Sequence, residues 1–444
     1  MPVPAPVYRP RNPIQTPYYR CVEDHLETLE QVYEDRFERT YGFFRPHVRK
    51  VMERYLDCGN LLNGFARIKC EDCGHEYLLA FSCKRRHFCP SCHQKRVVEF
   101  GEWLCQNVIK AVPHRHFVFG IPKILRRYFL YDRRLLLELS RCIWESLKIY
   151  YQYCMPGKNS VPGTTIAIQT FGDFLGFNPH GHVLITDGSF PEKGLFKVAP
   201  AVRLKYLEKI FRSKVISLLL SKGKITPDYI NLLKSWKHSG FQVFCGPRIH
   251  PRKKEAMENL ARYIIRASFS QERMTYLPEE SRIIYRSKDK RQEKAFDALD
   301  WLAAMCSHIP DQREQMVRYY GFYSNVSRGI RQKANEDALI PCILEPDENK
   351  KPNQKWARLI QKIYEVDPLA CPQCQGLMRI ISIIEDQEVI DKILGHLGLW
   401  KNNQRPPPKP KSLEIQIDSS DSQLPFYEEA FDQDFEVSAD YPTV

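Results

Sequence analysis

The sequence predicts an α+β protein, with a middle domain of short strands and long helices between two cysteine-containing flanks. Helix-like and strand-like stretches alternate along the chain, without an internal repeat or a long low-complexity tract before residue 405. CxxC pairs occur only near the two ends of this region, two before residue 100 and one after residue 370. Strands mixed with long helices in this order favour the α+β class, and the cysteine pairs favour zinc-ribbon-like flanks.

The individual elements are predicted from the spacing of apolar residues. Helix-like spacing covers residues 14–60, 96–112, 134–153, 204–221, 254–267 and 297–308, and two more helices are expected within 355–400. Strand-like alternation or short apolar runs cover residues 114–122, 165–170, 182–186, 240–244 and 285–287.

The composition excludes several classes of protein. Hydrophobic residues make up 43% of the chain and aromatic residues 12%, which is ample for a packed core and excludes global disorder. No uncharged apolar run approaches the roughly 20 residues that span a bilayer, and the N-terminus lacks the apolar region of a secretory signal. Fifteen cysteines without such a signal fit metal binding better than disulfides. We expect a soluble, cytoplasmic protein with no membrane partner.

The charge is distributed unevenly. The formal net charge is +13, yet residues 412–444 hold nine acidic residues and no Lys or Arg. The preceding chain is therefore more basic than the whole, and such a surface attracts polyanions. The tail follows a Pro/Lys-rich linker at residues 405–411 and is predicted to be disordered. A solvated tail is the simpler interpretation, and competition with DNA for the basic surface is the alternative.

The first cysteine-rich block has the spacing of a structural zinc site. Cys70 and Cys73 form one CxxC, fifteen residues precede the next, and Cys89 and Cys92 form the second. Two such turns can close a tetrahedral site of four thiolates, so these four residues are the predicted zinc ligands. Cys83 and His87 lie inside the loop and are further candidates, either as replacement ligands or for a second site. The lysines and arginines around the loop fit contacts to DNA phosphates.

The C-terminal pair, Cys371 and Cys374, lacks an evident second pair. Cys342 and His396 are the nearby candidates, and their spacing is unhelpful for a zinc site. The sequence leaves the role of this pair open.

The segment from Phe177 to Thr186 is the most informative part of the chain for chemistry. His180 and His182 alternate on a predicted strand, so both imidazoles project from the same face and can chelate one divalent ion. An HxH pair by itself is weak evidence for a metal site. His114 and His116 alternate in the same way, and for them sheet packing or a backbone or DNA contact is the simpler interpretation.

Several motifs in a fixed order carry a resemblance to a known family. They are His114-Arg-His-Phe-Val-Phe-Gly-Ile-Pro122, Gln169-Thr-Phe-Gly-Asp-Phe-Leu175, Asn178-Pro-His-Gly-His182, Arg318-Tyr-Tyr-Gly-Phe-Tyr323 and Asp367-Pro-Leu-Ala-Cys-Pro-Gln-Cys374. The chain resembles the rolling-circle transposases of the insertion sequence ninety-one family, which belong to the HUH (His-hydrophobe-His) endonucleases. The resemblance extends over roughly residues 15–400 and leaves out only the acidic tail.

This resemblance implies a ferredoxin-like antiparallel sheet with the paired histidines on its central strand. His180 and His182 would hold a catalytic Mg²⁺ or Mn²⁺ with Gln169 as the third ligand, where Asp173 or Asp187 could assist. A glutamine oxygen suits these hard cations. Gly181 departs from the family pattern, since a hydrophobic residue is expected between the two histidines.

The resemblance also implies the nucleophile. The family's RYxxR-like segment matches Arg262, Tyr263 and Arg266, so Tyr263 would attack the DNA phosphate while the two arginines offset the developing charge. No tyrosine lies four residues before or after Tyr263, so the chain resembles a single-tyrosine member. Tyr319 and Tyr323 are the rival nucleophiles, spaced as i and i+4.

We therefore expect four regions: residues 1–97, helical and zinc-binding; 98–330, catalytic; 331–404, CxxC and helical; and 405–444, the acidic tail. The expected protein is a bacterial, nucleoid-associated, metal-dependent tyrosine transposase. It would nick and rejoin single-stranded or hairpin DNA at element ends through a 5′-phosphotyrosine and transfer it to target DNA. A replication initiator or relaxase of the same superfamily is one alternative, and a non-catalytic zinc-containing DNA-binding repressor is another. The sequence leaves the oligomeric state open between a monomer and a dimer.

Overall fold

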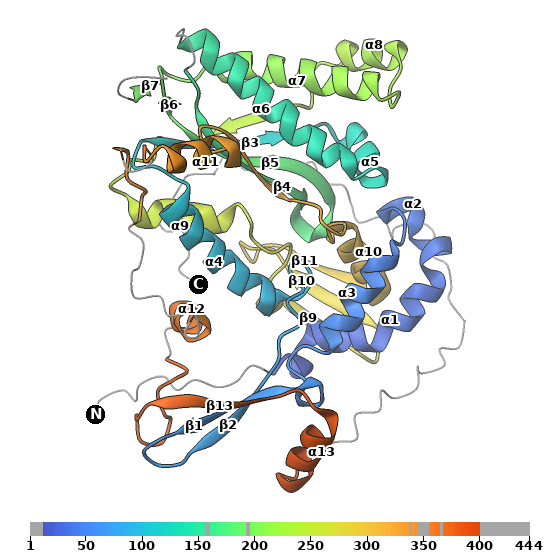
Figure 1. The fold of residues 1–444 in the computed structure, drawn as a ribbon. Coiled ribbons are helices and arrows are strands. Elements are labelled where there is room, and N and C mark those ends of the chain that lie inside the picture. The colour runs from blue at the N-terminus through green and yellow to red at the C-terminus, as the bar shows by residue number, and fades with distance from the viewer. Residues whose placement is uncertain are drawn as a thin grey trace.

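A five-stranded antiparallel sheet forms the centre of the protein (Figure 1). The computed structural model describes residues 12–155, 160–191, 196–336, 339–344, 355–364 and 367–399. The strand order is β12-β4-β5-β3-β8. The strands are β3 (His114–Gly120), β4 (Gly163–Phe171), β5 (Phe177–Thr186), β8 (Gln242–Cys245) and β12 (Val317–Gly321).

Helices cover both faces of this sheet, which is why β4 and β5 are buried along their whole length. On one face lie α5 (Lys123–Tyr131), α6 (Arg134–Cys154), α7 (Leu204–Ser221) and α8 (Pro227–Ser235). On the other lie α4 (Pro90–Asn107) and α9 (Lys254–Tyr263). Because side chains alternate along a strand, Val183 of β5 packs in the core under α6 and α7, whereas its neighbour Leu184 packs in the core under α4 and α9.

A second hydrophobic core joins the N-terminal helices to a segment far along the chain. It contains α1 (Pro17–Arg36), α2 (Glu38–Tyr41), α3 (Pro46–Leu56), α10 (Ala298–His308) and a three-stranded sheet of β9 (Met274–Leu277), β10 (Arg282–Arg286) and β11 (Glu293–Asp297). Trp301 of α10 is buried at its centre, with its ring centre 4.9 Å from that of Tyr285 and 5.3 Å from that of Phe296. This core therefore crosses the boundary expected at residue 97.

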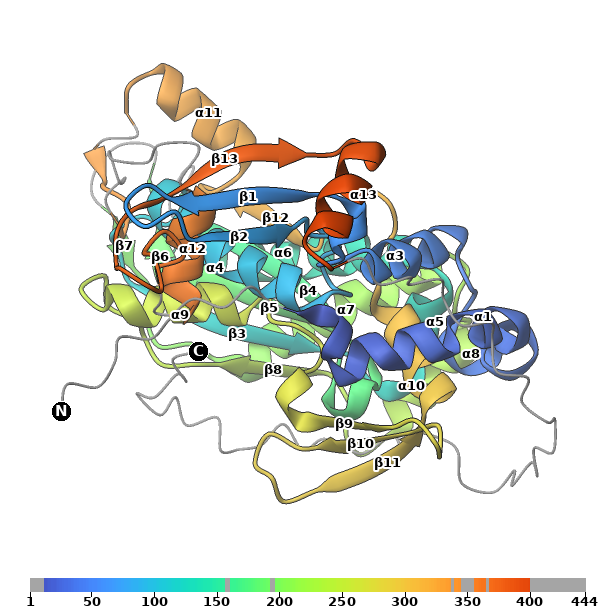
Figure 2. The same ribbon diagram turned by 90° about the horizontal axis from the view of Figure 1, so that it is seen from below.

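The two cysteine-containing flanks meet in one small sheet. Its order is β13-β1-β2, formed by β1 (Phe65–Cys70), β2 (Glu76–Ala80) and β13 (Met378–Ile384). Figure 2 shows β13 lying alongside β1, although the two strands come from opposite ends of the chain. The remaining elements are α11 (Asn325–Lys333), α12 (Lys355–Tyr364), α13 (Gln387–His396), β6 (Gly188–Ser189), β7 (Lys197–Val198) and 3-10 turns at Pro13–Gln15, Leu61–Asn63, Asp173–Leu175 and Gln271–Arg273.

The expected α+β class with antiparallel sheets is confirmed, whereas the ferredoxin-like assignment stays a prediction. The helix expected at 204–221 is α7, but the helix expected at 254–267 ends earlier, at Tyr263. Strand β13 was not expected, because the C-terminal flank was predicted to be helical apart from its CxxC. The division into four regions stays a prediction, and the tail lies outside the described residues. Nowhere in the described ranges is a helix long and apolar enough to cross a membrane.

Candidate active site and cysteine clusters

The candidate site lies on the sheet face covered by α4 and α9. In the antiparallel register Gln169 of β4 is opposite His180 of β5, so their side chains share a face. His182 follows two residues later on the same face, and His116 of β3 belongs to the same layer. Alternation along each strand and the pairing of β4 with β5 together bring the predicted metal residues to one place.

The imidazoles form a chain of short contacts. The Nε2 atoms of His180 and His182 are 3.2 Å apart, and Nδ1 of His182 is 3.0 Å from Nε2 of His116. Nδ1 of His180 donates to the carbonyl oxygen of Asn178 at 2.7 Å, which leaves Nε2 with a lone pair for a ligand. The contact of His116 with His182 was not expected from the sequence, since alternation alone does not show which strands are neighbours.

The side-chain amide of Gln169 is hydrogen-bonded through its nitrogen but not through its oxygen among the described residues. Its Nε2 donates to the carbonyl oxygen of Ile264 at 2.9 Å. Its Oε1 is buried and has no hydrogen-bond partner among the described residues. An orphaned carbonyl oxygen costs free energy unless it gains a partner. This oxygen and the two histidine Nε2 atoms lie on the same face of the sheet and are donors of the kinds that bind divalent cations.

Tyr263 is the last residue of α9 and packs directly over the histidines. Its ring centre is 5.5 Å from that of His182 and 6.3 Å from that of His116, and it stands at 86° to both rings. Burial raises the pKa of Tyr263, and the nearby positive charge of Arg266 lowers it in part. The Arg266 guanidinium carbon lies 4.8 Å from the centre of the Tyr263 ring.

The second predicted arginine has a different environment. Arg262 donates to the carboxylate of Glu258 at 2.6 Å, and Lys362 of α12 reaches the same oxygen at 2.5 Å. Lys362 also pairs with Glu102 of α4 at 2.8 Å. Arg262 therefore belongs to an ion-pair network that joins α4, α9 and α12, and of the two arginines Arg266 is the one placed against the Tyr263 ring.

Two of the alternatives from the sequence, Asp187 and Tyr323, occupy structural positions. Asp187 is fully buried and pairs with Arg115 at 2.8 Å and with Arg248, so its charge is already compensated. Tyr323 is also fully buried, and its hydroxyl contacts Nε2 of His114 at 2.8 Å. Tyr319 lies on strand β12, so the rival tyrosines do not share a helix.

Gly181, the departure from the family pattern, has a packing explanation. A Cβ atom at this position would clash with the Cδ1 atom of Ile143, which packs from α6 against the opposite face of the sheet. The methyl group of Ile143 therefore fills the space that a hydrophobic side chain would take, and the two histidines on the other face are unaffected.

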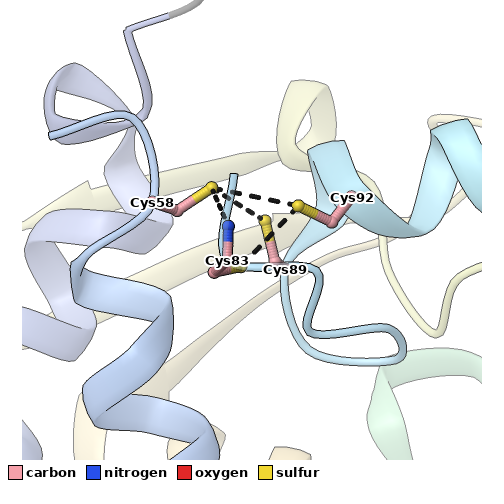
Figure 3. A group of neighbouring side chains, drawn as sticks. All are labelled: Cys58, Cys83, Cys89 and Cys92. Atoms are coloured by element: carbon pink, nitrogen blue, oxygen red, sulfur yellow. Dashed lines mark hydrogen bonds between the residues drawn. The ribbon is translucent and has the colours of Figure 1, made fainter. Parts of the chain in front are cut away.

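Four buried cysteines form the first cluster, near the start of α4 (Figure 3). They are Cys58, Cys83, Cys89 and Cys92. The Sγ–Sγ distances are 3.8 Å for Cys58–Cys89, 3.9 Å for Cys58–Cys92 and 3.7 Å for Cys83–Cys92. Zinc–sulfur bonds of about 2.3 Å in a tetrahedron give an edge of about 3.8 Å, so the spacing fits zinc.

The second cluster joins the two flanks. It contains Cys70, Cys73, Cys371 and Cys374. The Sγ atoms of Cys70 and Cys374 are 3.4 Å apart, and those of Cys73 and Cys371 are 3.5 Å apart. In the described part of the chain, these two clusters are the places where ligand atoms of three or more His, Cys, Asp or Glu side chains lie close enough together to share a metal ion.

The predicted pairing of the cysteines was wrong, although all of the predicted cysteines lie in clusters. Cys70 and Cys73 are grouped with Cys371 and Cys374, not with Cys89 and Cys92. The spacing of a CxxC turn says nothing about its partner turn, and pairing of β1 with β13 brings the distant pair close. Cys58 was missed because it is a lone cysteine without a CxxC.

His87 is not part of the cluster. It contacts His93, which in turn contacts the segment after Tyr263. Its backbone N–H donates to Nδ1 of His93 at 3.1 Å, so the proton of His93 is on Nε2. That Nε2 donates to the carbonyl oxygen of Ile265 at 2.8 Å. The segment after Tyr263 is thus held on one side by Gln169 of the sheet and on the other by His93, one residue after the cluster ligand Cys92.

Two family models match the chain. Residues 163–330 match the model described as "Putative transposase", and residues 28–121 match the "Transposase zinc-binding domain". A relative described as "Transposase for insertion sequence element IS801", from Pseudomonas savastanoi pv. phaseolicola, is 25% identical over 84% of this chain and 90% of its own length. "Putative transposase y4qJ" from Sinorhizobium fredii is 22% identical over 79% of this chain and 92% of its own length. No solved structure matches the chain.

Proposed function

Because the chain belongs to the insertion sequence ninety-one family of transposases, we propose that it nicks and rejoins single-stranded DNA at insertion-sequence ends. The observation that supports this most is the placement of the Tyr263 ring over His182, with ring centres 5.5 Å apart. A tyrosine nucleophile and a pair of metal-ligating histidines are the two parts that such a cleavage needs.

The step is a transesterification. The Tyr263 hydroxyl oxygen forms a bond to the scissile phosphorus and loses its proton, while the bond to the 3′-oxygen breaks and that oxygen takes up a proton. The products are a 5′-phosphotyrosine and a free 3′-hydroxyl. The phosphotyrosine is again a phosphodiester, so the free energy of the broken bond is retained. A 3′-hydroxyl of target DNA can therefore displace Tyr263 later without ATP.

The residues that would hold the catalytic cation are His180 and His182, through Nε2, and Gln169, through Oε1. A bound Mg²⁺ or Mn²⁺ would supply Lewis-acid polarisation of a non-bridging phosphate oxygen. The contact between Nε2 of His116 and Nδ1 of His182 fixes the orientation of the His182 ring, so that its Nε2 atom faces the cation site. Arg266 lies against the Tyr263 ring and can offset negative charge that develops on the phosphate and the phenolic oxygen.

The two cysteine clusters would each hold a structural zinc ion, because four thiolates without an open position suit a closed tetrahedral site. The basic loop that carries Cys83 and Cys89 would contact DNA near the element end, such as a hairpin beside the cleavage point. A second protomer that supplies another Tyr263 is one way in which a single-tyrosine chain could complete successive strand transfers.

Covalent capture tests this function. Purified protein is mixed with labelled single-stranded element ends and Mn²⁺ or Mg²⁺, and adducts are separated by denaturing electrophoresis. We expect a metal-dependent adduct with the wild type and none with Tyr263→Phe, because the phenolic oxygen is the nucleophile. Tyr319→Phe is the matched control and should retain the adduct. An adduct that survives Tyr263→Phe would refute the assigned nucleophile, and specific binding of ends without any adduct would favour the repressor alternative.

A further inference from the structure

A cavity of about 600 Å³ opens beside the candidate site. Parts of the chain that are far apart in sequence line it: the loop of the first cysteine cluster, α6, β4, the segment after α9, and β12. Gln169 and Arg266, which flank Tyr263, are both in its wall. Its volume is within the range of ligand sites, about 300–1,000 Å³. Whatever it binds lies next to the reacting groups.

The wall of the cavity is strongly basic. Five arginines line it, against a single acidic residue, Glu314. The arginines are Arg86, Arg96, Arg141, Arg266 and Arg318. Glu314 is paired with the buried Arg133 at 3.0 Å and its charge also acts on Arg318, so this one carboxylate is shared among several guanidinium groups.

Several of these guanidinium groups gain from an anion. The Nε atom of Arg266 is buried without a hydrogen-bond partner among the described residues. Burial lowers the pKa of Arg318, which means that its charged form is poorly solvated, whereas Arg86 is exposed at the mouth of the cavity. Among the described residues, Arg96 and Arg141 form ion pairs within their own helices, with Glu99 at 3.5 Å and Glu138 at 2.8 Å. A phosphate can replace such surface pairs at a small cost in free energy.

Aromatic side chains share this wall. Tyr319 and Tyr320 of β12 both line the cavity. The Tyr320 ring stacks on Trp144, with ring centres 5.5 Å apart and 14° between the planes, and its hydroxyl is 2.8 Å from that of Ser140. The Tyr319 and Trp103 rings meet edge to face, with ring centres 5.8 Å apart, and the Arg328 guanidinium carbon lies over one face of the Tyr319 ring at 5.3 Å. Rings held in this way present surfaces on which unpaired bases stack.

We propose that this cavity binds the unpaired nucleotides adjoining the scissile phosphate, with their phosphates on Arg318 and Arg86 and a base against Tyr319. This inference rests on the proposed function, and it adds the path that the single DNA strand takes next to the cleavage point. Arginines with interleaved aromatic rings are the chemistry of single-stranded nucleic-acid sites. A cavity of this size is too small for a duplex, so the strand that enters it must be unpaired.

If the cavity binds DNA, the first cysteine cluster contributes to DNA binding. Arg86 lies between the ligands Cys83 and Cys89, and Arg96 follows Cys92 on the first turns of α4. A metal that fixes these cysteines also fixes one wall of the cavity.

Binding and its salt dependence test the proposal. A fluorescent single-stranded oligonucleotide that spans an element end is titrated with Arg86→Ala/Arg318→Ala and with the wild type, and anisotropy is measured at several salt concentrations. Two lost phosphate contacts should weaken binding at least tenfold and reduce the salt slope by about 1.4, at about 0.7 per contact. Arg282→Ala on β10, the same change of charge outside the cavity, should match the wild type. Wild-type affinity and slope in the double variant would overturn the proposal.

Crosslinking of the wild-type protein keeps the test independent of folding and of catalysis. A photoreactive base analogue placed next to the cleavage point should crosslink to the peptide that contains Tyr319, identified by mass spectrometry. Crosslinks confined to other parts of the chain would overturn the assignment. Tyr263→Phe should bind and crosslink like the wild type, so failure of the covalent chemistry and failure of this binding site give different results.

Discussion

Each of the two cysteine clusters consists of four cysteines, but the surroundings of the two clusters are very different. In the first, all four cysteines are buried, and Cys58, Cys83, Cys89 and Cys92 are part of the large core that also holds α1, α3 and α10. In the second, Cys73 and Cys374 are exposed, and the core around Cys70 and Cys371 consists of a few residues of the small sheet. The same metal would therefore support a large core in one place and a small peripheral sheet in the other.

Their positions along the chain differ as well. The cysteines of the first cluster lie within one short stretch, whereas Cys73 and Cys371 of the second are 298 residues apart. Closing a long loop costs conformational entropy that grows slowly with its length. A metal in the second cluster removes that freedom by tying the two flanks together, while the first cluster supports the segment that follows Tyr263 through His93.

The largest expected effect follows from opening the first cluster. Cys89→Ser should lower the zinc content by one ion per chain, reduce the free energy of unfolding by more than about 3 kcal/mol, and abolish the covalent adduct. Metal analysis, thermal unfolding and covalent capture measure these three quantities. Cys154→Ser, a cysteine outside both clusters, is the control and should behave like the wild type. A stable, active Cys89→Ser protein would show that the clusters do not differ as described.

An intermediate effect is expected at the residue that links the first cluster to Tyr263. His93→Ala removes the hydrogen bond to the carbonyl oxygen of Ile265, so Tyr263 is held less firmly and the rate of adduct formation should fall about tenfold. Zinc content should not change, because His93 is not a ligand. His93→Gln can restore the donor and should recover part of the rate. His75→Ala is the control, and an equal loss of rate there would contradict the positioning role.

The smallest effect on catalysis is expected at the second cluster. Cys374→Ser should also lower the zinc content by one ion per chain, yet leave adduct formation within about threefold of the wild type, because this cluster is separate from the core beneath Tyr263. Limited proteolysis should instead cut within residues 367–399 far faster than in the wild type. Loss of the adduct without any change in proteolysis would mean that the second cluster acts on the active site.

The residues of the candidate active site could be named from the sequence because they lie on regular elements. Alternation along β5 places His180 and His182 on one face, and the family motifs indicated Gln169 and Tyr263. What alternation cannot give is the order of strands across the sheet. The contact of His116 with His182 depends on β3 lying next to β5, so its role was not predicted.

By itself the sequence determined the antiparallel α+β class, the basic and cysteine-rich character, and the histidines and tyrosine of the candidate site, because these depend on local periodicity and on motifs in a fixed order. Only the tertiary structure decided which cysteines share a cluster, that the two flanks form one sheet, and that Arg266 rather than Arg262 lies against the Tyr263 ring. Each of these depends on contacts between residues far apart in the chain or on which side of a helix is engaged. Spacing along the sequence carries no information about such contacts.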